Sequence, residues 1–342
     1  MSAQCITLHL SDERIRAVDG NLEGSQVVLS SFIMQENIGS FFKDDSISNL
    51  KNIAANIEKI VVGLQTKVKN VNIVIPDTYS FSQILSMPKL KEKELLSAIK
   101  YQADQFIPMP IEETAIDLEI LYEDQVNKQL MVLIVAAPLT LVTKIENVIE
   151  SAGLIPEIIE NELSATSRVI TLLNKPSDMP GGIIYVNFGF TSTSLYYFDH
   201  KSGHVIESHT FSLGYELFLK EIQVNMNLDS AKAHDTLKNF GGSKVSSVDI
   251  QPVIGPVLRD LVKEIEKFIL SIKEKHKVQT VTNLYLFNYA NNIPFLNSHL
   301  SSLLSVPSSF FDITPLIKKT AAVSNAQPDL SSFITAIGGC IG

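Results

Sequence analysis

One short pattern occurs twice in the chain and constrains its fold more than any other feature. The sequences ITLHLSDERIRAV (residues 6–18) and IIYVNFGFTSTSLYYF (residues 183–198) each predict a strand, a tight turn and a second strand, and a third strand follows in both places. His9 of the first copy aligns with Asn187 of the second. A three-stranded meander that begins twice, with helical segments between the copies, predicts a duplicated α/β fold with two lobes.

The length of the chain agrees with two lobes. Its 342 residues exceed the size at which a single hydrophobic core normally stops growing. The stretch KPSDMPGG, at residues 175–182, is the clearest linker and separates the two copies of the pattern. Apolar residues make up 45% of the chain, which is typical of a packed globular protein.

Charge and hydropathy exclude several classes of protein. The net charge is −9 and no basic tract is long enough to hold a phosphate backbone, so we expect no nucleic-acid partner. The longest apolar run, residues 130–139, is well short of the roughly 20 residues of a membrane-spanning helix. The first residues lack a basic segment followed by an apolar core, so we expect no signal peptide and a cytoplasmic location.

The sequence predicts no metal site. Cys5 and Cys340 lie near opposite ends of the chain and form neither a disulfide framework nor a metal-binding pattern. His200, His204 and His209 lie close together in the sequence, but no cysteine or carboxylate set completes a tetrahedral site. We therefore interpret these histidines as solvated residues around a turn.

A separate β-α-β-β-α unit is expected at about residues 79–158, before the linker. Its first helix, over residues 92–105, ends before the prolines of FIPMP, because proline lacks an amide hydrogen and disfavours helix in the residue before it. An alternating strand follows, and a strand at residues 129–137 and a helix at residues 141–152 complete the unit. FIPMP is therefore a rigid connector from helix to strand.

Several motifs, in order along the chain, resemble those of one family. The most specific is MPKLKEKELLSAIKYQADQFIPMPIEETAIDLEIL (residues 87–121), with a proline, a Glu-Leu pair in a helix, an aromatic-apolar-Pro-x-Pro turn and an acid in the next strand. Further matches are Ala136 and Ala137, SAGLIP (151–156), ENELSATSR (160–168) and TAIGG (335–339). On these motifs, nearly the whole chain resembles the PilM family of actin-like type IV pilus assembly proteins and, more distantly, the division protein FtsA.

The resemblance implies an actin-like fold, which is an α/β, duplicated RNase H-like, two-lobed architecture with the inserted subdomain of the PilM and FtsA families. The first-lobe core (subdomain 1A) is expected at residues 1–79, 159–180 and 320–342. The inserted subdomain (1C) is expected at residues 80–158. The second lobe is expected to comprise a core (2A) at residues 181–220 and 278–319 and a subdomain 2B at residues 221–277.

The resemblance also implies a function. In PilM-like proteins, the groove beside the inserted subdomain takes a short N-terminal cytoplasmic peptide of PilN, an inner-membrane protein. A chain of this kind is expected to be a non-enzymatic, cytoplasmic adaptor of type IV pilus assembly, or of a related secretion or competence system. Its partners are expected to hold it at the inner membrane. Pilus motor ATPases and other copies of the chain, in rings or filaments, are further partners that the resemblance implies.

FIPMP and the strand after it are candidates for that docking face. The candidate residues are two apolar residues, two prolines and three acids: Ile107, Met109, Pro108, Pro110, Glu112, Glu113 and Asp117. The prolines fix the backbone, so little order has to be gained on binding, and the apolar residues between them offer contacts. The acids favour a partner with a basic flank, as expected for a tail beside a membrane helix. Alternatively, the segment only packs the inserted subdomain on the lobe.

Actin-like ATPases hold Mg²⁺ and ATP between their lobes, and the resemblance assigns three loops to this task. Each of the two phosphate loops is normally an Asp-x-Gly turn, and a basic residue follows the first. The adenosine loop is normally a glycine pair after a strand. The residues at these positions are His9, Ser11, Arg16, Asn187, Gly189, Thr191, Ser192, Phe287 and Asn288.

All three loops depart from the family pattern. His9 and Asn187 replace the two aspartates, although Mg²⁺ needs hard oxygen ligands and usually a carboxylate. Ser11 and the pair Phe287-Asn288 replace glycines that let the backbone approach phosphate or base closely. ATP and Mg²⁺ are the cofactors that the family implies, but these loops lead us to expect a vestigial site without a bound cofactor.

Two other functions stay open. The chain is an active actin-like ATPase if substitute ligands come from elsewhere in the sequence. It is a division protein of the FtsA type if its C-terminus binds a membrane. The segment SSFITAIGGCIG, at residues 331–342, has no basic face, so we expect it to be a buried cap on the first lobe.

Overall fold

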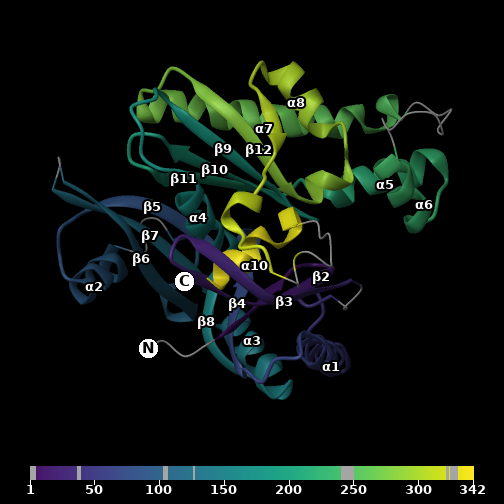
Figure 1. The fold of residues 1–342 in the computed structure, drawn as a ribbon, viewed down its shortest axis with the longest axis horizontal. Helices are drawn as coiled ribbons and strands as arrows, with labels where there is room; N and C mark the ends of the chain where they lie inside the picture. Colours follow the sequence, from purple (N-terminus) through teal and green to yellow (C-terminus); the bar gives the residue numbers. More distant parts are fainter. Residues whose placement is uncertain are drawn as a thin grey trace. The chain divides into compact units, whose positions relative to one another are not determined.

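The structure is a computed structural model, and it describes residues 5–36, 40–102, 107–125, 128–239, 250–320, 323 and 330–342. The chain forms two compact units, drawn in Figure 1. Unit 1 comprises Met1–Leu173, Thr314–Asp329 and Phe333–Gly342, and unit 2 comprises Asn174–Ile313 and Leu330–Ser332. Unit 1 is therefore built from segments that lie far apart in the sequence.

A five-stranded sheet forms the centre of unit 1. Its strands, in spatial order, are β3 (Gln26–Glu36), β2 (Arg14–Glu23), β1 (Ile6–Leu10), β4 (Asn70–Ile75) and β8 (Ile155–Asn161). Strand β1 runs antiparallel to β2 and parallel to β4. Because successive side chains of a strand point to opposite faces, β1 divides its residues between two layers. Leu8 belongs to the apolar core of one face, whereas Thr7 lies against Gly339 on the other.

Helices cover both faces of this sheet. Helices α1 (Ile47–Leu64) and α3 (Leu139–Ser151) pack together, and their buried residues join the core that contains Leu8. Helices α4 (Glu162–Leu173) and α10 (Ile334–Gly339) pack on each other, and α10 also contacts β1, β2 and β4. The first sheet therefore lies in the middle of three layers.

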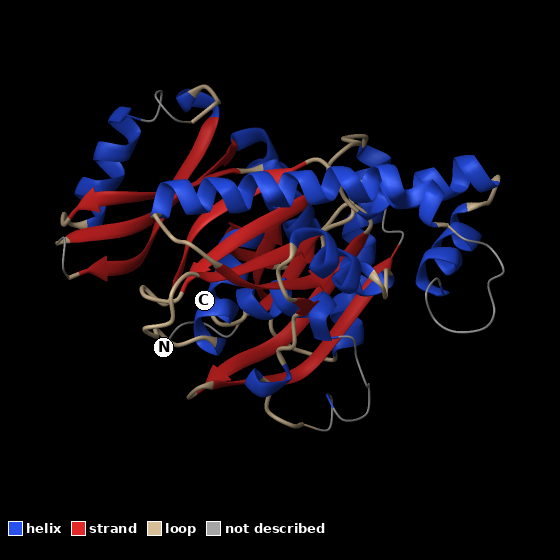
Figure 2. Cartoon of the chain, turned by 90° about the horizontal axis from the view of Figure 1, so that it is seen from above, coloured by secondary structure: helices blue, strands red, loops and turns tan. Residues whose placement is uncertain are grey.

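Unit 2 repeats this topology. Its strands, in spatial order, are β11 (His204–Phe211), β10 (Thr193–Asp199), β9 (Gly182–Phe188), β12 (Val281–Asn288) and β13 (Ser308–Phe310). Strand β9 runs antiparallel to β10 and parallel to β12, as β1 does to its own neighbours. The helices are α5 (Tyr215–Met226), α6 (Ser230–Asn239), α7 (Gln251–His276) and α8 (Leu296–Leu304). The long helix α7 runs beside β10 and β11 and supplies much of the core (Figure 2).

An inserted three-stranded sheet interrupts unit 1 between β4 and β8. Strand β7 (Gln129–Pro138) lies between β5 (Phe81–Pro88) and β6 (Thr114–Asp124), and both pairings are antiparallel. Helix α2 (Glu92–Gln102) buries Leu95 and Ile99 against this sheet. The 3₁₀ turns η1 (Asp77–Tyr79) and η3 (Ile111–Glu113) precede β5 and β6.

The structure corrects several predicted boundaries. The polar segment DGNLEGS (residues 19–25) predicts a turn, but β2 continues to Glu23, because its exposed end still pairs with β3 in a long hairpin. The apolar spacing of residues 293–304 predicts a helix, but α8 begins at Leu296, because helix is disfavoured at Ile293, the residue before Pro294. Helix α2 is described to Gln102, and residues 103–105 of its predicted end lie outside the described residues.

One of the three clustered histidines is not solvated as we expected. His200 is buried, its Nε2 lies 3.3 Å from the Thr282 hydroxyl, and its ring meets Phe198 edge to face. His209 is half-exposed and lies 3.9 Å from a carboxylate oxygen of Glu264. Within the described ranges, no three metal-ligating side chains come together. The same part of the chain contains no helix long and apolar enough to cross a membrane.

Helix α10 packs unusually close to α4. All of its residues are buried, and a Cβ placed on Gly338 would lie 2.0 Å from the carbonyl oxygen of Ala165. The neighbouring Gly339 also has no room for a side chain, since a Cβ placed on it would lie 2.5 Å from the Thr7 methyl group. Glycine is therefore required for the C-terminal helix to reach its position against the sheet.

Gly338→Ala should destabilise the protein by about 1–3 kcal/mol, because the backbone of α4 cannot move aside as a flexible side chain would. Chemical denaturation, followed by circular dichroism, measures this change. A variant as stable as the wild type would show that α10 does not pack on α4 this closely.

Candidate functional site

A cavity of about 420 Å³ lies between the first sheet and the inserted sheet of unit 1. We call it the Arg168 groove. Its apolar lining consists chiefly of Ile75, Ile116, Val135, Val142, Ile158 and Ile159. Its polar lining includes Asn72, Asp117, Glu119, Glu160, Asn161, Ser164 and Arg168. These residues come from β4, β6, β7, β8, α3 and α4, so the groove exists only in the folded unit.

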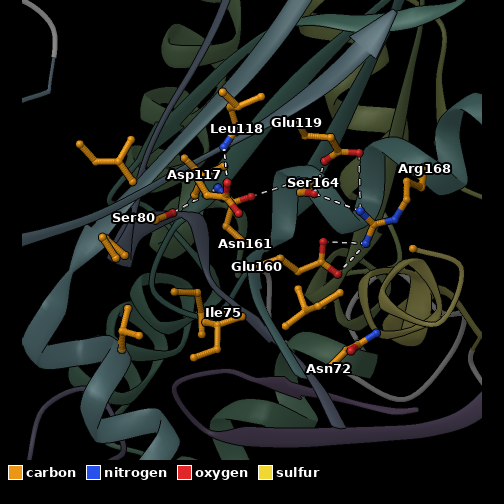
Figure 3. A pocket seen from close by; sticks show the side chains of 18 residues that line it. Asn72, Ile75, Ser80, Asp117, Leu118, Glu119, Glu160, Asn161, Ser164 and Arg168 are labelled. Carbon is orange, nitrogen blue, oxygen red and sulfur yellow. Dashed lines mark hydrogen bonds and ion pairs between the residues drawn. The ribbon is translucent and has the colours of Figure 1, made fainter. Parts of the chain in front are cut away.

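Arg168 forms the centre of a polar network in this groove (Figure 3). Its Nη2 donates to both carboxylate oxygens of Glu160, at 2.5 and 2.6 Å, and its Nη1 lies 3.8 Å from Glu119. Ser164 accepts from Nη1 at 3.1 Å and donates to Glu119 at 2.6 Å. Arg168 Nε donates to the carbonyl of Gly338 at 3.1 Å. Burial raises the pKa of Glu160, although the charge of Arg168 opposes this shift.

Polar side chains at the start of α4 tie the inserted sheet to the first sheet. Asn161 donates through Nδ2 to the hydroxyls of Ser80 and Ser82, at 3.2 and 2.5 Å. Its Oδ1 accepts from the backbone N–H of Ser164 at 3.0 Å, which caps the helix. Asp77 accepts from the N–H of Leu163 at 2.9 Å. The backbone N–H groups of Leu163 and Ser164, in the first turn of α4, therefore hold the side chains of Asp77 and Asn161 in place.

Asn72 leaves an acceptor unused beside the groove. Its Nδ2 donates to the carbonyl of Gly339 at 3.1 Å, and its buried Oδ1 has no hydrogen-bond partner among the described residues. A buried polar atom without a partner is costly and usually marks a water or ligand position. A bound group with an N–H or O–H donor would satisfy this oxygen.

Two sheet edges border the Arg168 groove. Strand β8 is the last strand of the first sheet, and β6 is the last strand of the inserted sheet. Edge strands present backbone N–H and C=O groups that can pair with an added strand. Ile158, which is 47% exposed, offers apolar surface on β8 beside these groups. The arrangement is suited to an extended peptide with apolar side chains.

The structure separates the residues that we expected in one docking face. Asp117 lines the Arg168 groove, whereas Pro108 and Met109 line a second cavity. Ile107 was expected to offer a surface contact, but it is buried against Ala136. The alternation of FIPMP did not reveal which apolar residue points inward. The other three candidates line neither cavity: Pro110, Glu112 and Glu113.

The first phosphate-loop position is an internally bonded cluster in unit 1. His9 is buried at the end of β1, and its Nε2 donates to Glu162 of α4 at 2.8 Å. Arg16 Nη1 lies 3.5 Å from His9 Nδ1 and donates to the Ser11 hydroxyl at 3.4 Å. Since Nδ1 faces a guanidinium donor, the ring proton is on Nε2. Burial, and secondarily the charge of Arg16, hold the pKa of His9 well below its ordinary value of 6.5.

The second phosphate-loop position, in unit 2, has the same turn with different side chains. The N–H of Gly189 donates to the carbonyl of Ser192 at 2.9 Å, as the N–H of Ser11 does to that of Arg14. Thr191 and Ser192 are partly exposed beside this turn. Asn187 is buried and accepts from the side chain of Asn288 at 3.0 Å. The two loops therefore share their backbone but not their polar chemistry.

The adenosine-loop residues do not form an open binding surface. Phe287 is buried in β12 and its ring meets Phe311 edge to face, so it is a core side chain of unit 2. Asn288 has a φ of 68°, a conformation that asparagine tolerates better than most residues do. The Asn288 side chain bonds Asn187, and Phe287 lies beside Asn187 in the parallel pairing of β9 and β12.

Sequence reasoning assigned no site role to Glu119, Glu160, Ser164 or Arg168. Three of them lie in ENELSATSR, which we used only as a family motif. The available signal was the spacing of Ser164 and Arg168, which puts both on one face of a helix. No local signal places Glu119 beside them, because it belongs to a strand 45 residues before Ser164.

His9→Gln should remove a pH dependence of stability. The unfolded chain protonates this histidine below about pH 6.5, whereas the folded protein does not, so wild-type stability falls as the pH falls. Between about pH 6 and pH 5, the wild type should lose up to about 1.4 kcal/mol per pH unit more than the variant. Denaturant titrations across this range measure the difference. His209→Gln, at a half-exposed position, is the control, and equal slopes for wild type and His9→Gln would contradict the burial of a neutral ring.

Comparison with known proteins identifies the fold. A PilM-PilN type IV pilus biogenesis complex contains a chain that is 18% identical, with a TM-score of 0.79 and full coverage of both chains. Ethanolamine utilization protein EutJ from Carboxydothermus hydrogenoformans is 12% identical, with a TM-score of 0.57 and coverage of 99% of this chain and 89% of EutJ. A Bacteroides thetaiotaomicron protein with an actin-like ATPase fold is 11% identical, with a TM-score of 0.51 and coverage of 98% and 96%. These similarities confirm the predicted actin-like fold.

The family follows from the sequence itself. The family model for type IV pilus assembly protein PilM matches residues 8–341, which is nearly the whole chain and includes both units and the inserted sheet. This match confirms the resemblance drawn from the motifs. The chain belongs to the PilM family of type IV pilus assembly proteins.

Proposed function

We propose that this chain is an adaptor of pilus assembly whose Arg168 groove binds the N-terminal cytoplasmic tail of a PilN-like inner-membrane protein. The observation that carries this proposal is the groove itself, with an apolar floor and two sheet edges at its border. The similar chain of the PilM-PilN complex supports the choice of partner. The adaptor would lie in the cytoplasm and be held at the inner membrane through this tail.

The charges of the groove fit such a tail. Among the residues that the structure describes, three carboxylates line it, from Asp117, Glu119 and Glu160, and one cation, Arg168. Arg168 is already bonded to Glu160, so the net charge that remains favours a basic residue in the partner. Cytoplasmic segments beside a membrane helix are rich in lysine and arginine. Motor ATPases and further copies of the chain would meet other surfaces of the same adaptor.

Ile158→Glu should weaken binding of the tail peptide by at least tenfold, or about 1.4 kcal/mol, because it places a charge on the apolar floor. Isothermal titration calorimetry with a synthetic peptide of the tail measures the affinity. Ile155→Glu is the matched control, because Ile155 is also exposed on β8 but does not line the groove. Equal affinity of Ile158→Glu and wild type would rule out the groove as the docking site.

We also propose that the protein does not hydrolyse ATP. Both ring nitrogens of His9 are used, one by Glu162 and one by Arg16, and Asn187 provides no charge for Mg²⁺. These residues do not fit a magnesium-bound nucleotide, so no reaction step is assigned to them. An active actin-like ATPase is the competing function, and Gly189, with the hydroxyls of Thr191 and Ser192, is the feature that favours it.

Purified wild-type protein should release no more phosphate from ATP and Mg²⁺ than its Asn187→Ala variant does. The physical reason is that His9 and Asn187, at the two positions where the family pattern has aspartate, supply no carboxylate to hold the metal. A coupled phosphate-release assay makes the comparison, and calorimetry with ATP and Mg²⁺ tests binding separately. Steady turnover by the wild type that Asn187→Ala abolishes would make the chain an active ATPase.

A further inference from the structure

Strand β8 presents its edge to the Arg168 groove. Residues 158–161 of this strand all line the groove, although consecutive side chains of a strand point to opposite faces of the sheet. The helices agree, because Val142 of α3 lines the groove from one face of the first sheet and Arg168 of α4 lines it from the other. A groove that reaches both faces lies along the edge of the strand.

Strand β6 of the inserted sheet is the second edge at this groove. Residues 115–119 of β6 line the groove, and Val135 and Ala137 of β7 line it beside them. The register pairs Val135 and Ala137 with Asp117 and Ala115, so these four residues lie on one face of the inserted sheet. The inserted sheet therefore covers the groove with this face, and the outer edge of β6 lies along its margin.

The two edges differ in the backbone groups that they leave for a ligand. The N–H of Leu118 on β6 donates to the carboxylate of Asp117, the residue before it, at 2.8 Å (Figure 3). This side chain occupies a donor that a strand added to β6 would need. The backbone of residues 157–160 on β8 pairs with β4 and, in the described part of the chain, with nothing else. The edge of β8 is therefore the one open to an added strand.

The two sides of the β8 edge have different chemistry. On the α3 side, the groove is lined by the apolar side chains of Ile75, Val142 and Ile159. On the α4 side, the paired charges of Glu160 and Arg168 lie in the groove. The side chains of an added strand would alternate between these two sides. Such a strand needs apolar residues at every second position and can carry polar residues between them.

We propose that the tail bound in the Arg168 groove is a β-strand that pairs with β8 and adds a sixth strand to the first sheet. This inference rests on the proposed function for the identity of the ligand, and it adds the way in which the ligand is held. Backbone hydrogen bonds to β8 supply affinity, and the apolar side chains at alternate positions supply specificity. Asp117 keeps the edge of β6 from pairing with the same strand.

A scan of amide-to-ester replacements along the synthetic tail peptide tests the pairing. Each replacement removes one backbone N–H without adding bulk, and a strand with a single neighbour bonds that neighbour through every second N–H. Replacements at alternate positions should weaken binding by about tenfold in isothermal titration calorimetry, and replacements between them by much less. Equal losses at all positions, or no loss at any position, would overturn the proposal.

Two variants of Asp117 decide between the edges. Asp117→Asn removes the charge but keeps an oxygen that can accept from the N–H of Leu118, whereas Asp117→Ala removes both. If the tail pairs with β8, the two variants should bind it equally well, because only the lost charge affects binding. Tighter binding by Asp117→Ala than by Asp117→Asn would assign the pairing to β6 and refute the proposal.

The Ile158→Glu variant separates failure of this inference from failure of the proposed function. If Ile158→Glu weakens binding but the ester scan shows no alternation, the tail binds in the groove without pairing with β8, and only this inference is wrong. If Ile158→Glu binds the unmodified peptide as the wild type does, the groove is not the docking site and both proposals are wrong.

Discussion

Charged and polar groups buried where β8 meets α4 must find hydrogen-bond partners inside the protein, and these contacts hold unit 1 together. Isolated buried charges are strongly unfavourable, so each finds a partner from another element. Glu162 bonds His9 of the first strand, while Arg168 bonds Glu160 and approaches Glu119 of the inserted sheet. The same guanidinium bonds a carbonyl of α10. One helix and the residues before it thus connect the central sheet, the insertion and the C-terminal segment.

The duplicated hairpin shows how a fold can repeat while its chemistry diverges. Both copies close their turn with the same backbone hydrogen bond, at 2.9 Å in each, from Ser11 in one and Gly189 in the other. The side chains around the turns differ, since a buried imidazole occupies one copy and a pair of amides the other. Backbone geometry is set by sheet pairing, which tolerates many side chains, whereas metal and phosphate binding depend on particular ones.

Much of the architecture could be predicted, because strand alternation and proline signals are local. The repeated hairpin, the inserted unit and the actin-like fold all follow from such signals and from the family motifs. The Arg168 groove could not be predicted in this way, since it brings together side chains from Asn72 to Arg168 that have no common pattern. The alternation of FIPMP also failed to predict that Ile107 is buried. Either set of alternate residues could point inward, and the contact of Ile107 with Ala136 of β7 selects one of them.

The burial of α10 has a consequence for how the polypeptide matures. The side-chain hydroxyls of Thr335 in α10 and Thr166 in α4 lie 3.3 Å apart, although 169 positions separate the two residues along the chain. All of unit 2 up to Ile313 is synthesised between these partners. During synthesis on the ribosome, the face of the first sheet that α10 covers stays exposed to solvent until α10 has been made. Exposed apolar surface of this kind is what chaperones bind. Because the contacts of α10 join residues so distant in sequence, the packing of α10 on the sheet is expected to be slow.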